Sequence, residues 1–351
     1  MKDLLIILVF EFLTLCLTLN QSTMSAMLFD YCLQNEINLG AMQLESDTQS
    51  FLIQYTNPTS NEVEFSSEDQ IRVGSITKTM IAVAILLLAE EGKLSLEDNL
   101  ATFIEYPNAE NVTLRMLLQM RSGYLDFIGT EWFAEAERTC PNEILFSANE
   151  ILLRTKSEEL VSSDYLYSNT NYLLLGKVLE HVTESTADQV LDRMIFQKLG
   201  MKKTALKADP HFDYFHRKGF TKNKETTLWS ISWAWTAGGV ISTFNDVHIF
   251  MNALIKNELL SFDSLKLMIE KPFEEIKYTF EEGNERNGYY GLGIVIHGDW
   301  IFHNGSIPGY DSFIGFNQKI QATVSIFFNQ SREDRNMTAD FYEMITNEIN
   351  S

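Results

Sequence analysis

Residues 74–92 read GSITKTMIAVAILLLAEEG and predict a buried helix that begins with a serine and a lysine. The run over residues 80–89 is apolar on every side, which is typical of a helix surrounded by core, and it is too short to span a membrane. Gly92 provides a C-terminal stop. Ser75 and Lys78 are three residues apart, so they lie on one face of this helix.

This serine–lysine pair predicts a nucleophile beside its own base. A serine hydroxyl is a poor nucleophile at neutral pH, and a neighbouring amine with a lowered pKa can take its proton. The N–H groups at the start of a helix can also stabilise a developing oxyanion. The alternative is a serine that caps the helix and a lysine in solvent. Gly74 favours the first interpretation, because glycine permits a close approach of backbone.

Composition indicates a well-packed globular protein with an acidic surface. The 351 residues are 45% hydrophobic and 12% aromatic, which suits one large domain or two interlocked domains. The 27 basic and 48 acidic residues give a formal charge of −21, so nucleic acid is not expected as a partner. The sequence has no cysteine or histidine spacing typical of a metal site, and we expect neither a metal nor a cofactor.

The N-terminal residues differ from the rest of the chain. Residues 4–19 are apolar and leucine-rich, and small residues follow at 22–26, a pattern typical of a secretory signal peptide over residues 1–25. We expect export to the periplasm or the extracellular space, with an uncleaved membrane anchor as the alternative. Cys32 and Cys140 lie beyond this segment, and the sequence leaves open whether they pair.

Strand patterns lie at both ends of the chain and helical patterns lie between them. The predicted strands are 37–45, 51–55, 290–296, 300–303, 312–316 and 322–328. Beyond the Ser75 helix, the predicted helices are 25–36, 114–120, 143–155, 170–182, 187–199, 246–255 and 338–349. The predicted fold class is α/β (α+β), with an antiparallel sheet built from both termini, flanked by helices and interrupted by an all-helical domain. The expected boundaries are 26–93 and 226–351 for the sheet domain and 94–225 for the helical insertion.

Two further segments, one around Tyr167 and one around His303, carry candidate residues for the same site. The Tyr167 phenol can relay protons, and the Asn169 amide can hold a substrate amide or the lysine. His303 and Gly305 end a predicted apolar strand, where a backbone N–H could serve as a second oxyanion donor and the glycine would let a substrate approach. His303 could orient a hydroxyl or carry positive charge, since histidine titrates near neutral pH. The alternatives are a buried aromatic with a helix cap and a structural histidine.

These groups, in this order, resemble the serine β-lactamase and penicillin-binding protein superfamily. The resemblance is closer to its class C branch, which contains class C β-lactamases, D-alanyl-D-alanine carboxypeptidases, D-aminopeptidases and related esterases. It spans residues 35–330. The matching segments are 72–79, 91–98, 112–118, 122–123, 167–176, 199–201, 238–239 and 303–305.

The resemblance implies a role for each candidate residue. Ser75 attacks a carbonyl and forms an acyl-enzyme, while Lys78 and Tyr167 share the base and acid roles. Asn169 orients the substrate and His303 flanks the site, next to Gly305. The backbone N–H groups of Ser75 and Ser306 act as the oxyanion donors.

Two departures from the family pattern stand out. Met120-Arg121 precedes Ser122-Gly123, where the family often has histidine, and we interpret this position as structural, with a small effect. The second departure bears on the substrate. His303 stands where class C β-lactamases have the lysine of Lys-Thr-Gly, and His-x-Gly is more typical of carboxypeptidases, aminopeptidases and broad hydrolases. We therefore expect a serine hydrolase of D-amino-acid peptides, similar to D-alanyl-D-alanine carboxypeptidases. The alternatives are an esterase or weak β-lactamase that uses the same site, and a non-catalytic penicillin-binding scaffold.

Overall fold

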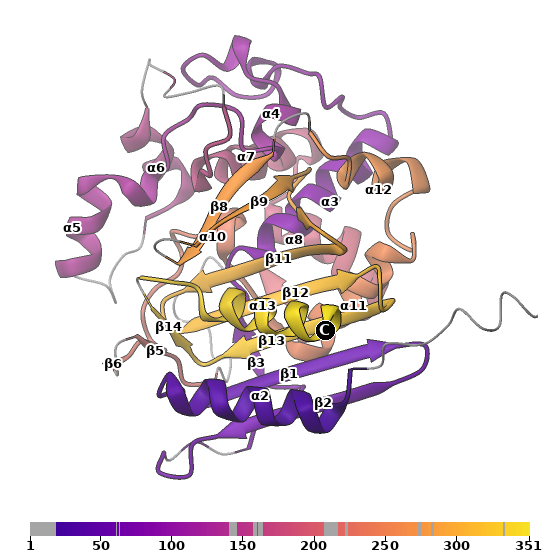
Figure 1. Ribbon diagram of the computed structural model, residues 1–351. Helices are drawn as coiled ribbons and strands as arrows, with labels where there is room; N and C mark the ends of the chain where they lie inside the picture. Colours follow the sequence, from indigo (N-terminus) through magenta and orange to yellow (C-terminus); the bar gives the residue numbers. More distant parts are fainter. Residues whose placement is uncertain are drawn as a thin grey trace, which may run out of the picture.

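An eight-stranded antiparallel sheet forms the centre of the protein, with strand order β2-β1-β13-β12-β11-β10-β9-β8 (Figure 1). Its strands are β1 Leu39–Ser46, β2 Ser50–Thr56, β8 Ile276–Glu281, β9 Asn284–Tyr290, β10 Val295–His297, β11 Trp300–Ile307, β12 Tyr310–Asn317 and β13 Ala322–Phe328. This computed structural model describes residues 19–60, 62, 64–139, 146–156, 160, 164–206, 217–221, 224–272, 275–281, 284–332 and 334–351. The predicted sheet from both termini is confirmed, because β1 pairs with β13 from Gly40 opposite Phe328 to Ser46 opposite Ala322.

Helices cover both faces of this sheet (Figure 1). The helices α2 (Gln21–Gln34) and α13 (Met337–Asn350) pack together on one face. The helices α3 (Ile76–Glu90) and α11 (Phe244–Ile255) lie on the other, with α3 against β11 and β12 and α11 against β12 and β13. Every residue of β13 is buried for this reason, as expected of a strand covered on both sides.

The helix α3 is the buried helix that the sequence predicts. Every residue from Ile76 to Leu88 is buried, Lys78 included. The helix ends at Glu90, and Gly92 follows in the left-handed conformation with φ of 68°. The structure thus places an apolar helix through the interior, with Ser75 at its N-terminus against β11.

The remaining helices lie mostly between the two groups of strands, as predicted. They are α4 Leu114–Leu118, α5 Glu131–Thr139, α6 Ala148–Thr155, α7 Asn169–Thr183, α8 Ala187–Leu191, α9 Gln197–Leu199, α10 Trp235–Gly238 and α12 Phe262–Met268. Short 3-10 turns occur at η1 Leu100–Thr102, η2 Ala109–Asn111 and η3 Phe127–Gly129, and a π turn, η4 Asp192–Phe196, joins α8 to α9. The boundaries at 93 and 225 stay predictions.

Two small sheets and one turn were not expected. The small sheets contain β3 Gln70–Arg72, β7 Val240–Thr243 and β4 Ala205–Leu206, and β14 Gln330–Ser331, β5 Phe220–Thr221 and β6 Lys224–Glu225. Strands of two to four residues show too little periodicity to be predicted. The predicted strand 290–296 is wrong, because the chain turns between β9 and β10, where Gly291 N donates to Ile294 O at 2.8 Å and Gly293 has φ of 73°.

The N-terminal boundary of the folded region also differs from the prediction. The helix α2 begins at Gln21 and its Met24 is fully buried, so folded structure starts before residue 26. Residues 1–18 and Cys140 lie outside the described residues, whereas Cys32 is a buried free thiol. Within the described ranges, no helix has the length and apolar character needed to cross a bilayer. Export, anchoring and cysteine pairing stay predictions.

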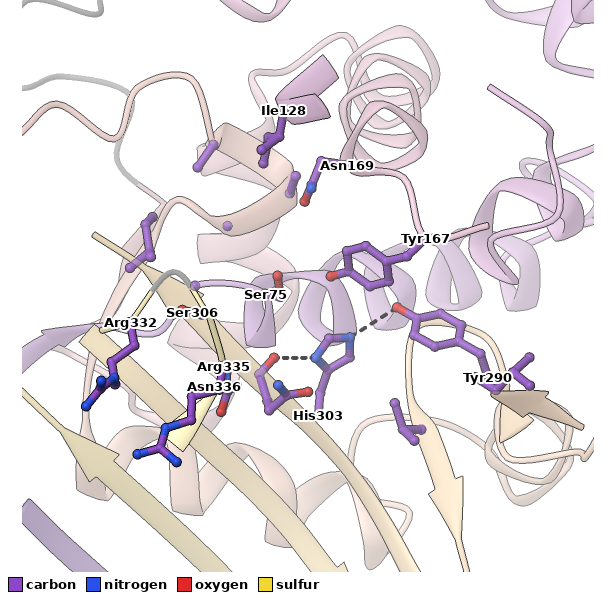
Figure 2. Close-up of a pocket in the computed structure, with 18 of the residues that line it drawn as sticks. Ser75, Ile128, Tyr167, Asn169, Tyr290, His303, Ser306, Arg332, Arg335 and Asn336 are labelled. Carbon is purple, nitrogen blue, oxygen red and sulfur yellow. Dashed lines mark hydrogen bonds between the residues drawn. The ribbon is translucent and has the colours of Figure 1, made fainter. Parts of the chain in front are cut away.

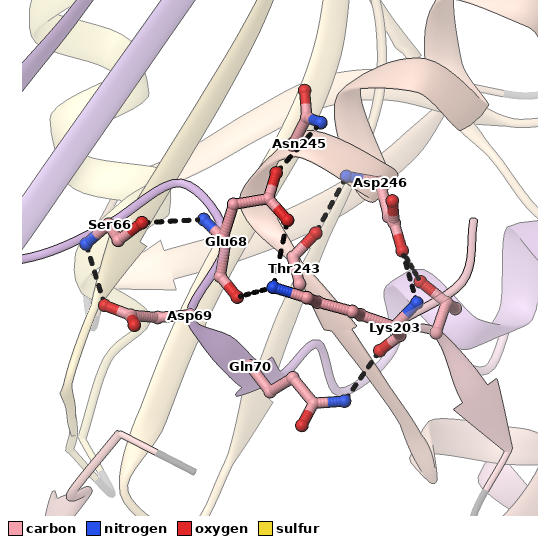
Figure 3. A network of polar contacts seen from close by, with 9 residues as sticks. Ser66, Glu68, Asp69, Gln70, Lys203, Thr243, Asn245 and Asp246 are labelled. Carbon is pink, nitrogen blue, oxygen red and sulfur yellow. Dashed lines mark hydrogen bonds and ion pairs between the residues drawn. The ribbon is translucent and has the colours of Figure 1, made fainter. Parts of the chain in front are cut away.

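A polar network holds the segment that leads into Ser75 (Figure 3). Lys203 forms an ion pair with Glu68 at 3.1 Å, and Gln70 of β3 donates to the Lys203 carbonyl at 2.8 Å. Asp246 of α11 accepts from the Lys203 N–H at 3.2 Å. Because β3 ends at Arg72, these contacts anchor the backbone three residues before the nucleophile.

Candidate active site

The Ser75 hydroxyl lies between a lysine and a tyrosine. It makes no helix-capping hydrogen bond. Lys78 Nζ lies 2.9 Å from Ser75 Oγ, and the Tyr167 phenol faces the same hydroxyl from the other side. Lys78 is fully buried, so the alternative of a capping serine with a lysine in solvent is wrong.

Lys78 is positioned to act as a neutral base. Its Nζ lies 2.8 Å from Asn169 Oδ1 and 2.6 Å from the Ala237 carbonyl oxygen of α10. Burial lowers the pKa of Lys78 to about 7, although Asp126 opposes the shift. A neutral amine can donate its two hydrogens to these oxygens, which only accept, and its lone pair then faces the Ser75 hydroxyl.

Tyr167 is suited to relay a proton rather than to start the reaction as a base. Its ring centroid lies 4.9 Å from Lys78 Nζ. Burial raises the pKa of Tyr167 well above its ordinary value of 10, so the phenol stays protonated at neutral pH. The protonation states thus favour Lys78 as the candidate base, and the Tyr167 hydroxyl can pass a proton between Ser75 and a leaving group.

Two glycines bring the nucleophile turn against β11. Gly74 has φ of 52°, and a Cβ there would lie 3.1 Å from Ser306 N. A Cβ on Gly305 would lie 2.1 Å from the Val73 carbonyl oxygen and 3.0 Å from Ser75 N. Gly305 thus faces the backbone of its own chain, and it is not among the cavity-lining residues.

The same approach provides a candidate oxyanion site. Ser75 and Ser306 both line the cavity, and the close approaches at Gly74 and Gly305 bring the backbone at these two residues together. Ser312 of β12 supports this arrangement by donating to the Val73 carbonyl at 2.8 Å. Paired backbone donors of this kind stabilise the oxyanion of an acyl-transfer reaction.

His303 lies in the wall of the site, between Tyr290 and the Asn304 carbonyl (Figure 2). Its imidazole is neutral. Its Nδ1 lies 2.6 Å from that carbonyl oxygen, so Nδ1 carries the proton, and Nε2 accepts from the Tyr290 hydroxyl at 3.1 Å. Burial, helped by Lys78, lowers the pKa of His303 to about 3. The expectation of a histidine that titrates near neutral pH is wrong. The strand also continues to Ile307, so His303 lies inside β11 and not at its end.

Several functional contacts were not found in the sequence. Asp126 accepts from Asn169 Nδ2 at 3.0 Å and from Asn169 N at 3.2 Å. Its position shortly after Ser122-Gly123 was the available signal. The sequence carries no signal for Tyr290 or for the Ala237 carbonyl, because their contacts depend on the tertiary fold. Met120, where the family often has histidine, supports the Tyr167 loop through its Sδ, which accepts from Ser168 N at 3.4 Å.

The site opens into a cavity of about 620 Å³ whose two sides differ in character. One side is apolar and includes Ile128, Trp233 and Ala234. The other carries Arg332, Arg335 and Asn336, which we call the arginine rim, and Figure 2 shows it on the opposite side of Ser75 from Tyr290. In the described part of the chain, no three His, Cys, Asp or Glu side chains could together hold a metal ion.

Comparison with known families now decides the classification. The family model described as Beta-lactamase matches residues 57–345. The chain belongs to this family. Protein flp of Staphylococcus aureus (strain MW2) is 24% identical over 284 residues, which are 78% of this chain and 55% of flp. The chain thus spans about half the length of the curated relatives it matches.

Solved structures of the same fold are similar over nearly the whole chain. The D-amino acid amidase of Ochrobactrum anthropi SV3 has a TM-score of 0.80 and 23% identity, covering 94% of this chain and 98% of the amidase. The D-stereospecific amidohydrolase of a Streptomyces species has a TM-score of 0.77 and 19% identity, covering 93% and 98%. The predicted fold class and superfamily are confirmed, and the chain has the fold of the β-lactamase-related family.

Proposed function

We propose that the protein hydrolyses D-amino-acid peptides through an acyl-enzyme on Ser75, as a D-alanyl-D-alanine carboxypeptidase does. Ser75 Oγ attacks the carbonyl carbon while Lys78 takes its proton, and the oxyanion forms between the N–H groups of Ser75 and Ser306. Tyr167 passes a proton to the departing amine as the C–N bond breaks. Water then attacks the ester, and Ser75 regains its proton.

One observation carries the catalytic part of this proposal. Lys78 has no exposed surface, lies 2.9 Å from Ser75 Oγ and satisfies two carbonyl-type oxygens. A buried lysine without a carboxylate in direct contact costs stability, since the charged form is desolvated. A base for the adjacent serine explains why this group is retained in the core.

The arginine rim supports a substrate that carries a carboxylate. Arg332 and Arg335 line the cavity, in a chain whose formal charge is −21. Each also contacts an acidic side chain, Arg332 with Asp334 at 3.3 Å and Arg335 with Asp340 at 3.6 Å. Because His303 is neutral, attraction of an anionic substrate falls to this rim. The D-amino acid amidase and D-stereospecific amidohydrolase structures support the D configuration of the acyl part.

The apolar side of the cavity favours a second candidate. Ile128 is 36% exposed and lies with Trp233 along the cavity wall. Such a wall suits the acyl group of a small ester, so an esterase with the same Ser75 chemistry is the second candidate. A neutral His303 makes efficient β-lactam turnover the less favoured activity, because the lysine of class C β-lactamases has no cationic counterpart at this position.

Parallel assays of the full chain test the proposal. The substrates are a peptide ending in D-Ala-D-Ala, its C-terminal amide, a chromogenic ester and a cephalosporin, with Ser75→Ala as the inactive reference. Arg332→Gln should raise KM for the peptide acid and leave the amide unaffected. Arg154→Gln is the matched control, because Arg154 packs on Trp132 and Phe146 and does not line the cavity.

Three outcomes would contradict the proposal. A cephalosporin kcat near roughly 10² s⁻¹, high in the usual enzyme range, would indicate a β-lactamase. Turnover of the ester but of neither peptide would indicate an esterase. Covalent labelling of Ser75 by penicillin without turnover of any substrate would indicate a non-catalytic scaffold.

A further inference from the structure

The Asp126 carboxylate contacts the site from behind. Its Oδ1 accepts from Asn169 N and from Ile128 N, each at 3.2 Å, and its Oδ2 accepts from Asn169 Nδ2 at 3.0 Å. Asn169 Oδ1 in turn accepts from Lys78 Nζ at 2.8 Å. Asp126 is not among the residues that line the cavity, so its effect on the reaction must pass through other groups.

We propose that Asp126 is a positioning residue, whose carboxylate holds the Asn169 amide with its oxygen toward Lys78 and its nitrogen toward the cavity. The proposal rests on acyl transfer by Ser75 and is independent of the substrate class.

Hydrogen-bond donors and acceptors around Asn169 favour this orientation. A carboxylate only accepts, so it selects the Nδ2 side of the Asn169 amide. In the flipped orientation, the amide oxygen would face the Asp126 carboxylate and the amide nitrogen would face Lys78. Both contacts would then be repulsive. With Asp126 in place, one Nδ2 hydrogen is used by the carboxylate and the second is available to a substrate carbonyl.

The charge of Asp126 also acts on the base. Burial raises the pKa of Asp126, while its three N–H donors and Lys78 favour the ionised form. The other groups that face Lys78 are Ser75, the phenols Tyr167 and Tyr172, and His303. Burial keeps both phenols protonated and the histidine neutral. Asp126 is therefore the anionic group that favours the protonated form of Lys78.

The test measures the rate at which a fluorescent phosphonate labels Ser75, as a function of pH, in the full chain. In Asp126→Asn, an amide replaces the carboxylate and accepts either orientation of Asn169. The rate at neutral pH should fall on the order of 10- to 100-fold, the size expected for a lost hydrogen bond to a charged group. The acidic limb of the profile should move to lower pH, because a negative charge that favours protonated Lys78 is gone.

A second variant of Asp126 and a double-mutant cycle with Asn169 distinguish a positioning role from a structural one. Asp126→Ser retains a side chain that can accept from Ile128 N, and should behave as Asp126→Asn does. When either Asp126 change is added to Asn169→Ala, the labelling rate should fall by less than about threefold relative to Asn169→Ala alone. The reason is that the effects of residues that act as a unit are non-additive. Asp98→Asn is the matched control, since Asp98 accepts from Ser95 N at 2.7 Å and does not line the cavity.

Two results would overturn the proposal. One is a rate loss in Asp126→Asn with an unmoved acidic limb, which would indicate a structural role. The other is a double variant whose loss is the product of the single losses. Failure of the proposed function would give a different result from failure of the Asp126 proposal. In that case the phosphonate would still label a protein in which Ser75→Ala is the only change.

Discussion

Lys78 shows how burial turns an ordinary side chain into a catalytic group. The amine is fully buried, and its pKa is lowered to about 7. Below that pH the amine is protonated and cannot accept the Ser75 proton, so we expect the acylation rate to rise with pH through about 7 and then level off. Phosphonate labelling between pH 5 and 9 measures this limb. A flat profile would show that Lys78 is not the base.

The same burial changes the choice of variant at this position. A lysine is not a core residue by type, yet Lys78 is fully buried. The structure shows that alanine would leave a void and two unpaired oxygens, at Asn169 and Ala237. Lys78→Met conserves more of the volume, and it should reduce acylation by a factor on the order of 10² or more while the protein still folds.

The residue pattern could predict the side chains that meet, but not their protonation states. Ser75, Lys78, Tyr167 and Asn169 were all candidates in the sequence, and the structure brings them together. The neutral state of His303 depends on burial and on Tyr290 and Asn304. Such contacts appear only when strands and helices have packed, so a single sequence carries no local signal for them.

At the scale of elements, the contact between the Ser75 turn and β11 is the feature that forms the oxyanion site. Gly305→Ala should disrupt it, because the new Cβ would lie 2.1 Å from the Val73 carbonyl oxygen and must push β11 away. We expect acylation to fall on the order of 10² or more, the size of losing an oxyanion donor. Gly129→Ala is the control, because a Cβ there meets nothing within 4 Å. Equal labelling rates in both variants would contradict this role.

The junction of β12 and α13 contains a second buried titratable group. Asp311 Oδ2 accepts from Met337 N, the first residue of α13, at 2.8 Å, and burial raises the pKa of Asp311 to about 7. A carboxyl whose pKa is raised on folding costs stability as pH rises from its unfolded pKa, about 4, toward its folded value, and the cost is constant above that.

Asp311→Asn should therefore gain stability relative to the unmodified protein between about pH 4 and 7, with no further gain above. The gain should be a few kcal/mol at most, since each pKa unit corresponds to about 1.4 kcal/mol. Urea unfolding of both proteins at several pH values measures the difference. A difference that does not change with pH would contradict the raised pKa.

At the scale of the whole molecule, both ends of the chain complete one sheet, and the site depends on that closure. Strand patterns at the two ends predicted a shared sheet, and β1 against β13 confirms it. The strand order was not predictable, because buried strands such as β13 are apolar at every position and their patterns do not specify a neighbour. The small strands β3 and β7 were missed, although β3 leads directly into the Ser75 turn.

A chain that ends at residue 285 tests this closure. The truncation removes most of β9 and all of β10, β11, β12, β13, β14 and α13, so β1 loses its partner β13 and the nucleophile loses the strand that carries Ser306. One face of α3 would also lose β11 and β12. We expect an aggregated or unfolded product that does not melt cooperatively, because the two remaining parts of the sheet share no strand pairing. Deleting residues 1–18, which lie outside the described residues, is the control and should leave cooperative melting intact. A soluble product of the C-terminal truncation with a sharp thermal transition would refute the dependence of the fold on both termini.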